Sequence, residues 1–167
     1  MPLAVTHVLL AIIVLDIFRD YFIKKKKLIP LHYIFIGGIA GLLPDIDIPV
    51  FWVVSLFKPS IDWFHGTFTH LFLIPLVILV ASLVTYRYNK KAGILLGIIS
   101  FSYGFHIILD FLFYGDAILP FWPIFNKSFN GLIAYINLPA LEMGLDAFIL
   151  LGWLWHEEKK HKISDFI

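Results

Sequence analysis

The chain has 167 residues, of which 60% are hydrophobic and 15% are charged. Soluble domains are typically about half apolar and a quarter charged, so this composition indicates a protein that lies in lipid. The formal net charge of +1 provides no basic field that would attract nucleic acid, and without cysteine any metal site must use histidine nitrogens and carboxylate oxygens. The length suits a single domain covering residues 1–167.

The apolar runs predict an all-α protein, a polytopic membrane bundle of about five transmembrane helices. A helix needs about 20 residues to cross about 30 Å of hydrocarbon. In chain order, the runs predict helices over residues 3–23, 28–43, 71–86, 92–114 and 139–155. The apolar run at residues 48–57 is too brief to cross, so it predicts one short interfacial or re-entrant segment.

The basic residues predict the orientation of this bundle, because cytoplasmic loops are enriched in lysine and arginine. Eleven of the 13 lysines and arginines follow the first, third and fifth predicted helices, and only Lys58 and Lys127 fall in the opposite loops. We therefore expect an integral protein of the cell membrane, with its N-terminus outside and its C-terminus in the cytoplasm.

Histidines and carboxylates gather at the outer ends of the predicted helices. An ionisable residue at mid-membrane costs about 2.5 to 3.5 kcal/mol, so such residues are functional candidates. The candidates are His7, Asp45, Asp47, His65, His70, His106, Asp110 and Glu142. The charge count and the placement of the polar residues are independent, and both indicate a site on the extracytoplasmic side.

The local spacing supports a shared site. His106 and Asp110 are four residues apart on a predicted helix, which places both side chains on one face. Asp45 and Asp47 lie between prolines, and we expect an extended stretch that sends them to opposite sides, so that one of them is a direct ligand. The alternatives are a simple imidazole–carboxylate pair for His106, and backbone capping for the two aspartates.

Five motifs together identify a family. They are Thr6-His7, Leu42-Leu43-Pro44-Asp45-Ile46-Asp47, His65 with Phe68-Thr69-His70, His106-Ile107-Ile108-Leu109-Asp110, and Leu119-Pro120-Phe121-Trp122-Pro123. In this combination the chain resembles the LexA-regulated, membrane-bound, metal-dependent hydrolases, or YdjM family, over roughly residues 1–145. The resemblance implies metal-site residues, which are His7, Asp45, His70, His106 and Asp110, with Asp47, His65 and Glu142 close by.

The chain departs from the family pattern at Gly66, where the pattern has an arginine. A guanidinium group is the natural bidentate partner of a phosphate. Recognition of a phosphate would therefore require Lys58 or Lys127. The segment from His65 to His70 also contains small residues, which allow a tight turn before the third predicted span.

The expected function is hydrolysis at a divalent metal, with one or two ions, expected to be Zn²⁺, lowering the pKa of water to about 7. The expected ligands are His7, Asp45, His65, His70, His106 and Asp110. Asp47 or Glu142 would take the proton. Because the site lies at headgroup depth, we expect membrane lipids as partners and a lipid-like or small phosphorylated amphiphile as substrate. The alternatives are a metal or small-solute transporter and a non-catalytic bundle that a metal staples together; no oligomeric state is predicted.

Overall fold

The computed structural model of the chain describes residues 4–60, 62, 65–113, 118–122, 124–125, 127–128 and 139–161. In the last of these ranges, side chains are described for residues 147–160.

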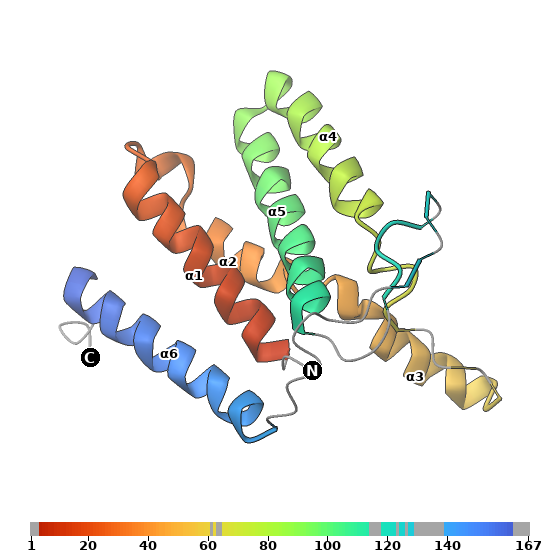
Figure 1. The fold of residues 1–167 in the computed structure, drawn as a ribbon. Coiled ribbons are helices and arrows are strands. Elements are labelled where there is room, and N and C mark those ends of the chain that lie inside the picture. The colour runs from red at the N-terminus through yellow and green to blue at the C-terminus, as the bar shows by residue number, and fades with distance from the viewer. Residues whose placement is uncertain are drawn as a thin grey trace.

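The described part of the chain is helical, as the sequence predicts (Figure 1). The α-helices are α1 (Ala4–Phe22), α2 (Leu31–Ala40), α3 (Asp47–Phe57), α4 (Leu73–Tyr88), α5 (Lys90–Phe113) and α6 (Pro139–His161), with 3₁₀ turns at Lys26–Leu28 and Pro44–Ile46. Each α-helix coincides with one of the predicted apolar runs. The helix α2 is shorter than predicted, because the chain tightens into the second 3₁₀ turn before it reaches α3.

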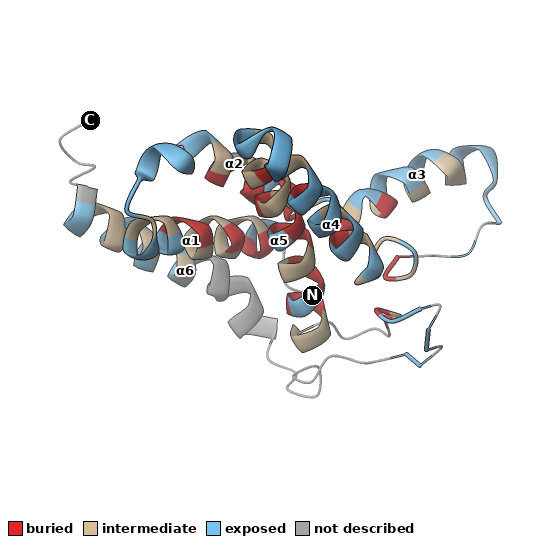
Figure 2. Cartoon of the chain, turned by 90° about the horizontal axis from the view of Figure 1, so that it is seen from above, coloured by how far each residue is buried: buried red, intermediate tan, exposed pale blue. Residues whose placement is uncertain are grey.

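The helix α5 lies at the centre of the fold, where α1, α2 and α4 pack around it (Figures 1 and 2). Leu15, Ile34 and Ile98 form a buried apolar cluster that joins α1, α2 and α5. The helix α3 leaves this core sideways, and most of its surface is exposed (Figure 2).

The helices α4 and α5 form a hairpin in which Gly93 allows a close approach of the two backbones. The Ser82 hydroxyl donates to the Gly93 carbonyl at 2.8 Å. A Cβ added at Gly93 would lie 2.5 Å from the Cα of Tyr86 and 2.6 Å from its backbone nitrogen. Because these are backbone atoms of the facing helix, they have little freedom to give way.

Alanine at Gly93 should therefore lower the stability of the bundle by about 1 to 3 kcal/mol, the usual range for overpacking. The matched control is Gly152→Ala in α6, where an added Cβ meets nothing within 4 Å. Its expected effect has the opposite sign, up to about 1 kcal/mol of stabilisation, because alanine favours helix more than glycine does. Thermal unfolding in detergent, followed by circular dichroism, measures both; equal shifts would contradict the close approach at Gly93.

By length and composition, α5 is the described helix that could cross a membrane by itself. The helix α2 and the segment Pro44–Phe57, bent by 48° relative to each other, would together pass as a second span. The helix α4 is apolar but shorter, and α1 carries Asp16, Arg19 and Asp20 in its last two turns.

Candidate metal centre

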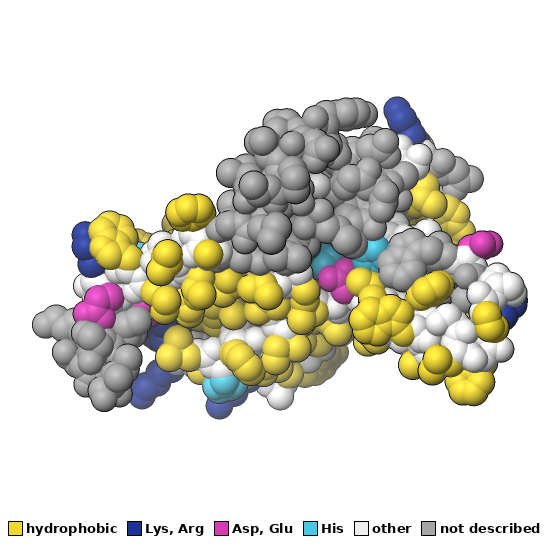
Figure 3. Space-filling model, turned by 90° about the horizontal axis from the view of Figure 1, so that it is seen from below, with side chains coloured by type: hydrophobic (Ala, Val, Ile, Leu, Met, Phe, Trp, Pro, Cys, Tyr) yellow, Lys and Arg dark blue, Asp and Glu magenta, His cyan; other side chains and the backbone are white. Residues whose placement is uncertain are grey.

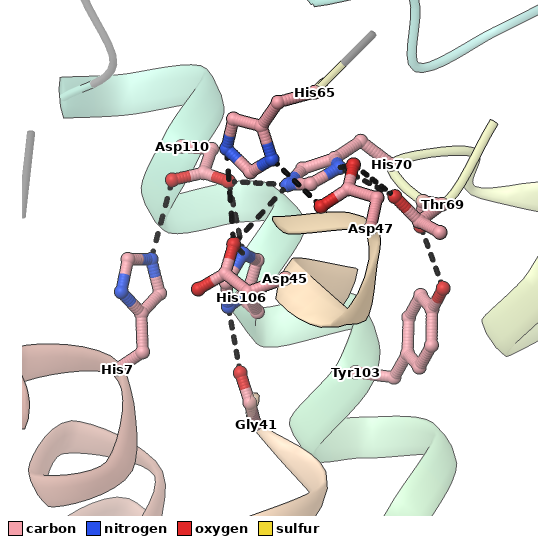
Figure 4. Close-up of polar contacts among 10 residues, drawn as sticks. All are labelled: His7, Gly41, Asp45, Asp47, His65, Thr69, His70, Tyr103, His106 and Asp110. Carbon is pink, nitrogen blue, oxygen red and sulfur yellow. Dashed lines mark hydrogen bonds and ion pairs between the residues drawn. The ribbon is translucent and has the colours of Figure 1, made fainter. Parts of the chain in front are cut away.

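The predicted site residues come from four separate segments and meet at one end of the bundle (Figure 4). The start of α1, the junction of α2 with α3, the loop before α4 and the second half of α5 supply them. They are His7, Asp45, Asp47, His65, His70, His106 and Asp110, and all are buried except the half-buried Asp45. The side chain of Glu142 lies outside the described residues.

The two aspartates do not lie on an extended stretch, so that prediction is wrong. Pro44–Ile46 is a 3₁₀ turn, and α3 begins directly after it at Asp47. The reason is the position of the prolines: Pro44 and Pro49 occupy first-turn positions, where the missing N–H has no intrahelical partner to lose. The turn carries both Asp45 and Asp47 toward the histidines.

Four side chains form the inner group, namely Asp45, His70, His106 and Asp110, and their ligand atoms all lie within 4.8 Å of one another. The Asp110 Oδ2 atom lies 3.0 Å from His106 Nε2 and 3.1 Å from His70 Nε2. The Asp45 Oδ1 atom lies 3.3 Å and 3.7 Å from the same two nitrogens. Two imidazoles and two carboxylates therefore converge and could hold a metal ion.

The opposite ring nitrogens are anchored by hydrogen bonds. His106 Nδ1 donates to the Gly41 carbonyl at 2.6 Å, and His65 Nδ1 donates to Asp47 Oδ1 at 2.8 Å. The other nitrogen of each ring, Nε2, lies near Asp45 Oδ1, at 3.3 Å for His106 and at 3.8 Å for His65. Histidines that bind metals commonly donate their other N–H to a carbonyl or carboxylate in this way.

The donor set fits a divalent cation. The Nε2 atoms of His7, His70 and His106 are buried and make no hydrogen bond, although each lies 3.0 to 3.2 Å from an oxygen of Asp110. Each nitrogen and its Asp110 oxygen are close enough to attract each other but are not aligned for a hydrogen bond. A buried polar atom without a hydrogen bond lowers the stability of the fold. A cation between the imidazoles and the carboxylates would satisfy both, and nitrogen with oxygen ligands suits zinc.

The pKa of His70, which lies in the loop before α4, reflects the charges of the inner group. Burial by itself lowers the pKa of the His70 imidazole, but the carboxylates of Asp110 and Asp45 outweigh burial, so that the pKa is raised. The two acids thus favour a positive charge at this point. A metal ion would take the place of that proton, because a metal needs the neutral imidazole.

A second group surrounds Asp47. Its Oδ2 accepts a hydrogen bond from the Thr69 hydroxyl at 2.8 Å, and Oδ1 is taken by His65. Asp47, His65 and His70 also lie close enough to hold an ion. The Tyr103 hydroxyl donates to the Thr69 carbonyl at 2.6 Å and so fixes the loop against α5. The sequence prediction missed Tyr103, although its position three residues before His106 puts it on the same helix face.

His7 lies slightly outside the inner group. Its Nε2 is 3.2 Å from Asp110 Oδ1, and its ring stacks on the ring of His106 at a centroid distance of 3.9 Å. His7 contacts the inner group through Asp110, whose Oδ1 atom faces His7 and whose Oδ2 atom faces His70 and His106 (Figure 4).

The comparison with known families confirms the family resemblance that the sequence motifs indicate. A family model described as "YdjM inner membrane protein" matches residues 1–164. The chain belongs to the YdjM family. No curated protein and no solved structure matches the chain significantly. Membership of the YdjM family makes the chain a membrane protein, as its composition predicts.

Gly66, where the sequence analysis notes a departure, has a structural role. Gly66 has a φ of 79°, in the left-handed region that costs other residues roughly 1 to 2 kcal/mol. It forms the tight turn that the small residues predict, and next to this turn His65 Nε2 lies 3.8 Å from Asp45 Oδ1 of the inner group.

Proposed function

We propose that this YdjM-family protein is a membrane-embedded, metal-dependent hydrolase in which Asp45, His70, His106 and Asp110 hold one Zn²⁺ ion. The observation that carries the proposal is the orientation of the imidazoles. His106 is anchored through Nδ1 on a backbone carbonyl, and its Nε2 is buried against two carboxylates without a hydrogen bond. A core histidine that serves only packing would have a partner at both nitrogens.

When bound, such an ion lowers the pKa of water to about 7 and polarises a substrate carbonyl or phosphoryl oxygen. The chain itself supplies the proton transfer. Both oxygens of Asp47 are engaged, which favours His65 as the group that accepts the proton of the attacking water, at Nε2. Asp47 would then hold the His65 ring in place and stabilise its positive charge.

We infer further that the bundle has five spans, with the metal centre on the extracytoplasmic side of the cell membrane. Support comes from the other end of α1, where cations converge on Asp20. Lys26 lies 2.9 Å from this carboxylate and Lys160 lies 3.0 Å from it. His7 lies 13 residues, or about 3.6 turns of helix, before Asp20, so the metal centre and the basic cluster occupy opposite ends of α1. The positive-inside rule predicts that the basic end lies in the cytoplasm.

The depth of the site suggests the substrate. A centre at the outer ends of the helices lies at headgroup level, and the half-buried Asp45 gives access to it. We therefore propose a lipid-like or phosphorylated amphiphile as substrate and membrane lipids as partners.

Metal analysis of the detergent-purified protein, combined with incubation with phospholipid extracts, tests the proposal. We expect about one equivalent of metal in the wild type and in the control His32→Ala, and at most about a tenth of that in His106→Ala, with loss of lipid hydrolysis. The exposed His32 lies on α2, outside the site. Metal uptake into proteoliposomes would indicate a transporter instead. Unfolding on chelation, with no hydrolysis by the loaded protein, would indicate a structural ion.

A further inference from the structure

An apolar groove runs along α3 and ends beside the metal centre. It consists of two adjoining hollows that share Ile46 and Val50. The inner hollow, of about 150 Å³, is also lined by Asp47, Thr67, Phe68 and Thr69. The outer hollow, of about 360 Å³, is completed by Pro49, Val53 and Val54.

The inner end of the groove is built from residues of the site. Asp47 and Thr69 line it, and Asp47 also holds His65, whose Nε2 lies 3.8 Å from Asp45 Oδ1. The groove therefore stops one side chain away from the inner group. Figure 3 shows acidic and histidine side chains reaching the surface directly beside hydrophobic ones.

The remainder of the groove is apolar and open to the side. Ile46, Val50 and Val53 expose 52%, 47% and 57% of their surface. The helix α3 leaves the core sideways (Figures 1 and 2), and these exposed side chains are therefore open to the surroundings of the bundle. In a membrane protein those surroundings are lipid. From Ile46 to Val54 the groove follows the helix for about 12 Å, at about 1.5 Å per residue.

We propose that this groove holds the apolar chain of the amphiphile whose polar head lies at the metal centre, an inference that rests on the proposed hydrolase function. The polarity of the lining selects this occupant. Only the inner end offers carboxylate and hydroxyl groups, and the outer wall is aliphatic. An amphiphile has the same division into a polar end and an apolar chain, whereas a headgroup alone or a soluble metabolite would leave the outer hollow unfilled.

The groove acts by orientation more than by affinity. A chain that moves from the bilayer into the groove leaves one apolar environment for another, so the hydrophobic effect contributes little. A chain fixed along α3 nevertheless aims its headgroup at the metal centre, and misplacement of a reacting group by about 1 Å can cost about 100-fold in rate.

Photolabelling in nanodiscs tests the groove independently of hydrolysis. The probe is a phosphatidylglycerol with a diazirine on its acyl chain, and the variant Val50→Trp fills the shared part of the groove. The control is Leu56→Trp, an exposed position on α3 that lines neither hollow. We expect labelling concentrated on residues 46–54 in the wild type and the control, and lost in Val50→Trp. Uniform labelling of all lipid-facing helices, or equal labelling of both variants, would overturn the proposal.

Turnover gives the second readout. On long-chain phosphatidylglycerol, Val50→Trp should be about tenfold slower than Leu56→Trp, whereas both should hydrolyse the dihexanoyl lipid at the same rate. Equal metal content shows that the site is intact. If Val50→Trp loses its metal, Val53→Trp, one turn further from the site, replaces it and should show the same dependence on chain length. Equal losses on both lipids would contradict the groove. Labelling of residues 46–54 without hydrolysis of any lipid would refute the hydrolase and leave the groove as a lipid site.

Discussion

Alanine at Asp110 should remove the bound metal and reduce hydrolysis to background. The Asp110 carboxylate contacts three imidazoles, those of His7, His70 and His106, at 3.0 to 3.2 Å. Without it, Asp45 is the one carboxylate left in the inner group for these buried rings. Loss of a supporting group already costs 10- to 100-fold in metal affinity, so loss of a direct ligand should cost at least about 100-fold. Isothermal titration with Zn²⁺ and metal analysis after dialysis measure this change.

Two further variants separate the metal effect from a general loss of structure. Asp110→Asn keeps the size of the side chain but removes its charge and replaces one acceptor oxygen with an NH₂ group, so it should bind metal much more weakly while the helical circular dichroism stays unchanged. Asp62→Ala removes an exposed loop carboxylate and should retain a full equivalent of metal. If Asp110→Ala retained a full equivalent as well, Asp110 would not be a ligand.

The helices could be predicted from the sequence because hydrophobic runs determine them. The run at residues 92–114 corresponds to α5 (Lys90–Phe113), and the run at 3–23 corresponds to α1 (Ala4–Phe22). The junction at Pro44 could not be predicted in the same way. A proline restricts the residue before it, but it also fits the first turn of a helix, and only the packing of the junction decides between the two.

The site was predictable where helical spacing fixed it and not where tertiary contacts did. The separation of four residues put His106 and Asp110 on one face, and their Nε2 and Oδ2 atoms lie 3.0 Å apart. No periodicity indicates that the Gly41 carbonyl accepts the proton of His106, or that Asp47 faces His65 across 18 residues of sequence. These bonds depend on how a loop folds onto a helix, which is why the role we propose for Asp47 differs from the one expected from the sequence.

Alanine at Asp47 should lower hydrolysis by about 10- to 100-fold while the metal content stays near one equivalent, since Asp47 supports His65 and is not part of the inner group. The double variant decides how Asp47 acts. If Asp47 works through His65, the rate of Asp47→Ala/His65→Ala should equal that of His65→Ala, because the two side chains form one unit. Thr69→Ala should cost less than Asp47→Ala, because Asp47 keeps its bond to His65. Additive losses of rate in the double variant would show instead that Asp47 takes the proton itself. Loss of the metal in Asp47→Ala would show that Asp47 helps to bind the ion.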